Sequence, residues 1–210
     1  MGQPTDGDRL FEDYLRHAGI AVPEHEPDLG IGVRIEYLLD LNGDTCATEV
    51  RQFDPESFPL RAGRSQSMQQ VLKPHRTQIH EAARKLREAR ALGHPLVVVL
   101  TDPENALFGL LRPGEIIAAI AGDLQVRQAV SASGSVGPAE LGAGRNGELR
   151  HDHPYVTAVV HIDHSGEHPR ARTFITNSPG AVPLPPVFFR GPDDLVWEYS
   201  DEASAYVPVR

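Results

Sequence analysis

Residues Arg34–Phe53, RIEYLLDLNGDTCATEVRQF, carry the strongest structural pattern in this chain. Apolar residues recur from Ile35 to Leu41, and Asn42-Gly43 then supplies two residues that tolerate a positive φ. The segment Thr45–Phe53 follows as a second run of strand-forming residues. This pattern predicts a β-hairpin.

Three charged residues of the predicted hairpin can share one face of the sheet. Glu49 and Arg51 are two residues apart on the return strand, so their side chains point the same way. Glu36, near the start of the first strand, can lie opposite them across the ladder. Two carboxylates and a cation in this arrangement can hold a hard divalent ion and balance a developing negative charge.

An acidic residue on one strand followed by Glu-x-Lys on the next resembles the signature of the PD-(D/E)xK nucleases, the restriction-endonuclease-like superfamily. Ile35-Glu36 stands where that family has Pro-Asp, and Glu49-Val50-Arg51 stands where it has Glu-x-Lys. The resemblance runs from a helix near Leu10 to a strand that ends near Leu100. In this chain Glu replaces Asp with a longer arm, and Arg replaces Lys with a guanidinium that is a poor proton acceptor.

The resemblance implies an α/β fold with a mixed β-sheet flanked by helices. We expect one domain, with a restriction-endonuclease-like core over about residues 8–102 and a C-terminal β extension over about 103–210. The implied activity is hydrolysis of phosphodiester bonds in nucleic acid with Mg²⁺ or Mn²⁺, in which Glu36 and Glu49 ligate the metal and Arg51 holds a phosphate oxygen. The alternative is a catalytically inactive, nuclease-derived module for binding or assembly with a protein partner, which the net charge of −9 and the proline-rich C-terminal segment favour.

The resemblance also implies roles for residues outside the hairpin. Glu12, on the first predicted helix, is either a further metal ligand or a solvated surface charge. Gln78 would orient water or substrate. Lys85 or Lys73 would replace the lysine that is missing from the strand motif. The literal Pro-Asp of Glu26-Pro27-Asp28 is a secondary candidate for the acidic position.

Around the hairpin, the sequence predicts two helices, a long loop and a buried strand. Residues 8–18 and 77–92 have apolar residues at helical spacing, with Asp8 as the expected cap of the first helix. The run PLVVVL in 95–100 predicts a fully buried strand, parallel to a hairpin strand. Residues 54–78 predict a mobile loop. Basic side chains of the loop and the second helix either bind a phosphate backbone or simply keep these segments solvated: Arg61, Arg64, Lys73, Arg76 and Arg84.

The second half of the chain carries weaker patterns. Residues 114–124 predict a helix, and 130–152 predict a flexible excursion rich in Gly, Ser and Ala. Residues 155–162 and 173–176 predict strands that extend the sheet. Histidines gather between His151 and His168, so a zinc site used by an unrelated hydrolase is a third possibility beside histidines in loops at strand edges.

Charge and composition limit the partners and the cellular compartment that we expect for this protein. The net charge of −9 argues against a general nucleic-acid coating protein, although it permits a local basic groove. The single cysteine, Cys46, favours a reducing compartment. No apolar run approaches the roughly 20 residues that span a bilayer, and the first residues lack a signal-peptide pattern. We therefore expect a cytoplasmic protein with no membrane partner.

Overall fold

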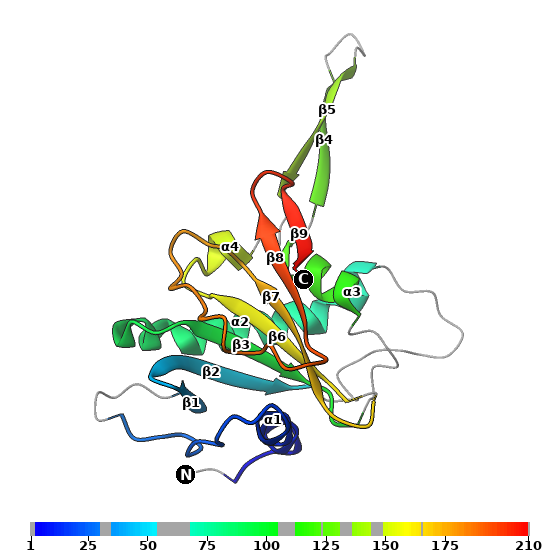
Figure 1. The fold of residues 1–210 in the computed structure, drawn as a ribbon. Helices are drawn as coiled ribbons and strands as arrows, with labels where there is room; N and C mark the ends of the chain where they lie inside the picture. The colour runs from blue at the N-terminus through cyan, green and yellow to red at the C-terminus, as the bar shows by residue number, and fades with distance from the viewer. Residues whose placement is uncertain are drawn as a thin grey trace.

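A seven-stranded mixed sheet forms the centre of the protein (Figure 1). The computed structural model describes residues 3–29, 35–53, 68–104, 112–122, 124–130, 136–143, 149–164 and 166–209. The strand order is β1-β2-β3-β6-β7-β8-β9, where β2–β3, β3–β6 and β7–β8 are parallel pairs and the other neighbours are antiparallel. The strands are β1 Tyr37–Leu41, β2 Asp44–Gln52, β3 Leu96–Thr101, β6 Ala158–Asp163, β7 Arg170–Ile175, β8 Leu195–Ser200 and β9 Ala205–Val209. The predicted α/β fold with a mixed sheet is confirmed.

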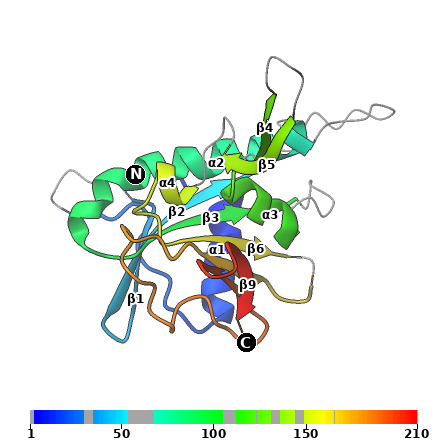
Figure 2. The ribbon, with the colours of Figure 1, turned by 90° about the horizontal axis from the view of Figure 1, so that it is seen from above.

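Helices cover both faces of this sheet (Figures 1 and 2). Helix α1 (Asp6–His17) packs on one face, and α2 (Met68–Ala89) and α3 (Pro113–Ile120) pack on the other. A 3₁₀ turn, η2 (Arg90–Leu92), continues α2. Two hydrophobic cores result, one on each side of the sheet. Within the described ranges, no helix has the length and apolar character that crossing a membrane requires.

The predicted hairpin is present as β1 and β2. Asn42 and Gly43 occupy the turn with φ values of 59° and 90°, the pair of left-handed conformations that a two-residue hairpin turn requires. Tyr37 is the first residue of β1 and pairs with Thr48. Glu36 therefore lies just before the strand and not within it, so the ladder alone does not fix its position.

The run PLVVVL forms the centre of the sheet as predicted. Every residue of β3 is buried, and β3 is parallel to β2 on one side and to β6 on the other. Helix α2 makes the crossover from β2 to β3 and contacts both strands. A strand covered on both faces needs apolar side chains on both, which explains the unbroken apolar run.

The second predicted helix begins earlier than expected. Its predicted start is residue 77, but α2 begins at Met68 and continues through Pro74. A proline inside a helix removes one backbone hydrogen bond, so the sequence favoured a loop here. Leu72 and His75, on either side of Pro74, are buried, and this packing outweighs the local cost. The loop prediction is therefore wrong for 68–78, while 54–67 lie outside the described residues.

The predicted excursion at 130–152 is also wrong in part. Strands β4 (Leu124–Val130) and β5 (Val136–Ala143) pair into a separate two-stranded ribbon that projects from the body of the protein (Figures 1 and 2). A short helix, α4 (Leu149–Asp152), follows. The remaining predictions for this half are confirmed with shifted boundaries: a helix at α3, strands at β6 and β7, and a C-terminal extension of the sheet.

Helix α1 is capped by Thr5 and not by Asp8. Thr5 accepts a hydrogen bond from the Asp8 N–H while the Asp8 carboxylate accepts one from the Thr5 N–H, which makes a capping box. Gly7 brings this end of the helix against β2 and β3, and its N–H donates to Gln52 Oε1 at 2.7 Å. A Cβ at Gly7 would lie 2.5 Å from Thr101 Oγ1 and 2.8 Å from Gln52 Cβ.

Gly7→Ala should therefore destabilise the protein by about 1–3 kcal/mol, because the added methyl group overpacks the contact between α1 and the sheet. Gly114→Ala is the matched control, since a Cβ added there would meet no atom within 4 Å and the residue lies in the first turn of α3. That change should be neutral or stabilising by up to about 1 kcal/mol. Urea unfolding of both variants checks this, and equal midpoints would contradict it.

Candidate functional site

Four charged side chains converge at one edge of the sheet, beside β1 and β2. They are Glu36, Glu49, Arg51 and Lys85, and we call them the carboxylate–lysine cluster. Lys85 Nζ lies 2.6 Å from Glu49 Oε1 and 3.7 Å from Glu36 Oε1. Arg51 Nη2 lies 3.1 Å from the same Glu49 oxygen. The sequence grouped the first three of these residues and named Lys85 as a substitute for the missing strand lysine.

Alternation along β2 explains why Glu49 and Arg51 face α2. Cys46 and Val50 pack into the core under α1, whereas Ala47 packs into the core under α2. Glu49 and Arg51 are two and four residues beyond Ala47, so they share its face. Helix α2 buries Ala82 and Leu86 against this face, which leaves Lys85 on the flank that reaches the β1–β2 edge.

Two hydrogen bonds hold Glu36 in place. Its carboxylate accepts a hydrogen bond from the Val50 N–H at 2.5 Å. Val50 lies beyond the last β1–β2 pair, Tyr37–Thr48, so the Glu36 side chain takes the place of a backbone acceptor from β1. Its backbone carbonyl accepts from the Glu26 N–H at 2.7 Å. Glu26 has φ 52°, a left-handed conformation that a non-glycine residue adopts at some cost. The secondary candidate Glu26 thus contributes through its backbone.

The two carboxylates of the cluster do not ionise independently. The Glu49 side chain is 2% exposed and that of Glu36 is 16% exposed. Burial, and next the neighbouring Glu49, raise the pKa of Glu36 to about 8. Burial also raises the pKa of Glu49, but Lys85 and Arg51 oppose that shift. Glu36 is therefore the carboxyl group that keeps a proton near neutral pH.

Glu12 does not join the cluster. Its carboxylate pairs with Arg16 at 2.9 Å and accepts a hydrogen bond from the Tyr37 hydroxyl at 3.2 Å. The carboxylate of α1 that acts on Glu36 is Asp8, which contributes to the raised pKa of Glu36. Sequence reasoning missed Asp8 because it assigned the residue only to helix capping.

Three of the basic residues predicted to bind a phosphate backbone, Lys73, Arg76 and Arg84, are described, and all three lie on α2. Arg76 is buried, and its guanidinium donates to the Ala118 carbonyl of α3 at 3.4 Å. Its contact with substrate stays a prediction. Arg84 is exposed beside Glu81 at 3.9 Å, and Lys73 is exposed on α2. Arg61 and Arg64 lie outside the described residues.

Gln78 lies on the same flank of α2 as Lys85. The two residues are seven positions apart, which is about 10 Å along a helix. Gln78 is half-buried. Within the described part of the chain, the structure shows no hydrogen bond between Gln78 and the cluster, so its predicted role in orienting water or substrate stays a prediction.

The histidines between 151 and 168 do not converge. His151 and His164 are exposed, His153 bonds to Tyr155, and His161 is buried in β6. His168 stacks on His17 of α1. Among the described residues, no group of three or more His, Cys, Asp or Glu side chains is arranged to hold a metal ion. The histidine-based zinc site is therefore not formed by this run.

A buried ionic network at the end of β6 was not foreseen. Asp163 Oδ2 accepts from Arg170 Nε at 2.9 Å and from Arg172 Nη2 at 2.7 Å. His161, opposite Arg172, is buried, and desolvation followed by Arg172 lowers its pKa to about 3. The His-x-Asp spacing of β6, which places both side chains on one face, was the sequence signal that could have found it.

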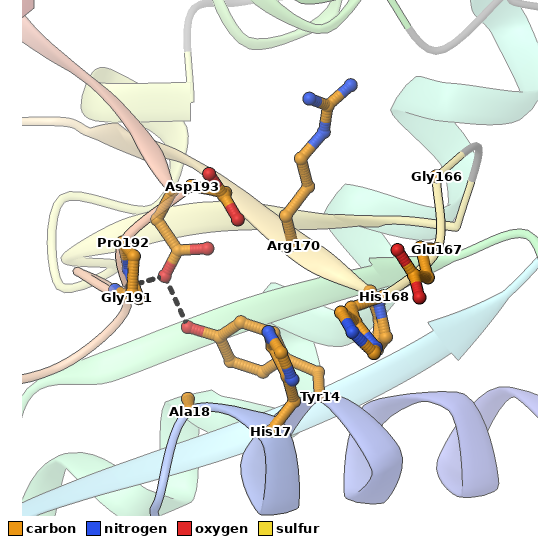
Figure 3. Close-up of a pocket in the computed structure, with 12 residues that line it drawn as sticks. Tyr14, His17, Ala18, Gly166, Glu167, His168, Arg170, Gly191, Pro192 and Asp193 are labelled. Atoms are coloured by element: carbon orange, nitrogen blue, oxygen red, sulfur yellow. Dashed lines mark hydrogen bonds between the residues drawn. The ribbon is translucent and has the colours of Figure 1, made fainter.

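A separate hollow of about 200 Å³ lies beside the C-terminal end of α1 (Figure 3). The imidazoles of His17 and His168 stack there with centroids 4.3 Å apart. The Tyr14 hydroxyl donates to Asp194 Oδ2 at 2.7 Å, and the Gly191 N–H donates to the same oxygen at 2.6 Å. The first bond ties the 191–194 loop to α1, and the second closes the loop on itself. No member of the carboxylate–lysine cluster lines this hollow.

Comparison with models of protein families, with curated proteins and with solved structures finds no match to this chain. Any function assigned to it therefore rests on the geometry of the chain itself.

Glu36→Gln should change how stability depends on pH. The unfolded chain ionises Glu36 near the ordinary value of 4.5, whereas the folded protein keeps the proton up to about pH 8. Stability of the wild type therefore falls as pH rises through this window, because the native state binds the extra proton. The amide keeps the acceptor for Val50 and does not ionise.

The stability of Glu36→Gln relative to wild type should therefore rise by on the order of 4 kcal/mol between pH 4.5 and 8. Urea unfolding across this pH range, with a chelator present, measures the difference. Parallel curves for the two proteins would contradict the raised pKa.

Proposed function

We propose that this chain is a metal-dependent hydrolase of nucleic-acid phosphodiester bonds, with the carboxylate–lysine cluster as its active site. The observation that carries the proposal is the position of Lys85. Its ammonium comes from α2, yet it lies 2.6 Å from Glu49 and within 4 Å of Glu36. The cluster thus combines two acidic groups with a lysine, the residue types of the PD-(D/E)xK signature, although the lysine comes from a different element.

The residues of the cluster fit a hard divalent cation such as Mg²⁺ or Mn²⁺. Mg²⁺ sites commonly use one or two carboxylates and leave the remaining positions to water and substrate phosphate. Glu36 and Glu49 supply two adjacent carboxylates, and burial, followed by the charge of Glu49, lets Glu36 retain its proton in the absence of a metal ion. The cluster meets solvent at Lys85, whose side chain is half-exposed.

Each residue of the cluster then has a chemical role. Glu36 and Glu49 would hold the ion, which lowers the pKa of a water molecule and neutralises charge on the scissile phosphate. Lys85 would orient the attacking water and stabilise negative charge as it develops. Arg51 would donate to a non-bridging phosphate oxygen, because a guanidinium presents several N–H donors in one plane.

Glu49→Gln and Lys85→Met should each lower metal-dependent cleavage of nucleic acid by at least about 100-fold, since each removes a group that contacts the ion or the reacting phosphate. Digestion of plasmid DNA and of RNA with Mn²⁺ or Mg²⁺ measures this, and EDTA should abolish it. Arg87→Met is the control, because it removes an exposed cation from the same helix, away from the cluster. Equal activity in Lys85→Met and wild type would overturn the role of Lys85.

A second candidate function is a binding or assembly module without catalysis. The observation that favours it is that Glu49 already has two cations of the chain, Lys85 and Arg51, within 3.1 Å. In that case the cluster is an ion-pair network that fastens α2 to the edge of the sheet, and it has no need of a metal.

Proton release on cation binding separates the two candidates. If Glu36 ligates a divalent ion, it must lose its proton, so Mn²⁺ binding at about pH 7 should release close to one proton per site. Calorimetry in buffers of different ionisation enthalpy counts these protons. Glu36→Gln should release none and should bind more weakly. A wild type that shows no heat of binding with Mn²⁺ or Mg²⁺ supports the ion-pair network.

A further inference from the structure

A chain of buried hydrogen bonds connects α2 to the segment that leads into β6. His80 Nδ1 lies 2.9 Å from His153 Nε2, and His153 Nδ1 lies 2.9 Å from the Tyr155 hydroxyl. The Tyr155 hydroxyl in turn donates to the Ala83 carbonyl at 2.9 Å. The chain of hydrogen bonds leaves α2 at His80, passes through His153 and Tyr155, and returns to α2 at Ala83.

The last acceptor fixes the direction of every bond in this chain. A carbonyl can only accept, so the single Tyr155 hydroxyl proton is used on Ala83. The hydroxyl must then accept from His153, which places the His153 proton on Nδ1. His153 Nε2 is consequently bare and accepts from His80 Nδ1–H. When both imidazoles are neutral, this is the one protonation pattern that satisfies all the contacts.

One added proton does not break the contact between the two imidazoles. If it enters His80 at Nε2, the Nδ1–H bond to His153 stays intact. If it enters His153 at Nε2, His80 can carry its own proton on Nε2 and accept from His153 at Nδ1. The contact is lost when both rings are protonated, because two N–H groups then face each other at 2.9 Å.

The charges around the pair reinforce this dependence. Burial is the main cause that lowers the pKa of both imidazoles. From α2, Arg76 and Arg84 act on His80, and Arg84 and Arg87 act on His153. From α4, Asp152 is the opposing charge for both rings. Arg90 of the same α2–η2 segment lies over the Tyr155 ring at 5.2 Å.

We propose that the His80–His153 contact is a proton-operated latch, which holds the segment Leu149–Tyr155 on α2 while at least one of the two imidazoles is neutral and releases it when both are protonated. This segment returns the chain from the β4–β5 ribbon to β6. Its release would be a local opening at this point of the fold. The proposal is independent of the activity of the carboxylate–lysine cluster.

The sign of the pH dependence follows from the lowered pKa values of His80 and His153. The unfolded chain takes protons on these histidines first, near pH 6.5, so the stability that the pair contributes is complete above this value and is lost as pH falls below it. His153→Gln is the decisive variant. A glutamine amide offers one donor and one acceptor at about the spacing of the imidazole nitrogens, and it does not titrate.

Thermal unfolding and amide hydrogen exchange of the full chain at about pH 7.5 and 5.5 test the latch. In the wild type, the His153 and Val156 amides, which donate to Leu149 and His153, should lose at least tenfold in protection factor at the lower pH. In His153→Gln, the fall in protection factor between the two pH values should be less than half of the fall in the wild type. The control variant is His164→Gln, which changes an exposed histidine beyond β6 and should behave as the wild type does. Equal losses in His153→Gln and wild type would overturn the proposal.

A second measurement keeps the test valid if His153→Gln does not fold. The ¹⁵N shifts of the imidazoles in the wild type report which nitrogen carries the proton. At about pH 8, His153 should be protonated on Nδ1 and bare on Nε2. The opposite tautomer, or a His153 ring that titrates with the ordinary histidine pKa, would also overturn the latch.

Discussion

The ion pair between Glu49 and Lys85 is the constraint on which the arrangement of this protein depends. A carboxylate that is 2% exposed in the face of a sheet is costly unless charged partners compensate it. Lys85 supplies that compensation only if α2 lies across β2 with one particular rotation. The same rotation turns Ile79, Ala82 and Leu86 into the core. Ionic and apolar requirements therefore select the same position for the crossover helix, and this agreement is typical of a well-specified fold.

Helix α2 makes a polar contact on each flank. Protonation has opposite effects on the two contacts. Toward β1 and β2, Lys85 meets a pair of carboxyl groups of which Glu36 keeps its proton. Toward α4, His80 meets His153, and this contact is lost when both rings are protonated. Protons therefore favour the first contact and oppose the second. Since both shifts arise mainly from burial, the packing of a single helix sets the pH response on both sides of it.

Local patterns were reliable where local chemistry and tertiary packing agree. Asn42-Gly43 can adopt the left-handed turn that joins β1 and β2, and Leu96–Thr101 has the apolar side chains that a strand buried on both faces requires. Prediction failed where packing overrides a local preference, as at Pro74, which sequence rules place in a loop and the structure places inside α2. It also failed at Asp8, which sequence rules treat as a cap and which acts electrostatically on Glu36.

The sequence by itself determined the hairpin, the buried strand, the α/β class and the shared face of Glu49 and Arg51, because these depend on turn chemistry and on the period of two along a strand. Only the tertiary structure decided that Lys85, and not Arg76 or Glu12, joins the acidic pair. It alone also decided that His153 meets His80 and not another histidine of its run. The physical reason is that the rotation of a helix and the path of a connection are set by packing between distant segments, which residue spacing does not encode.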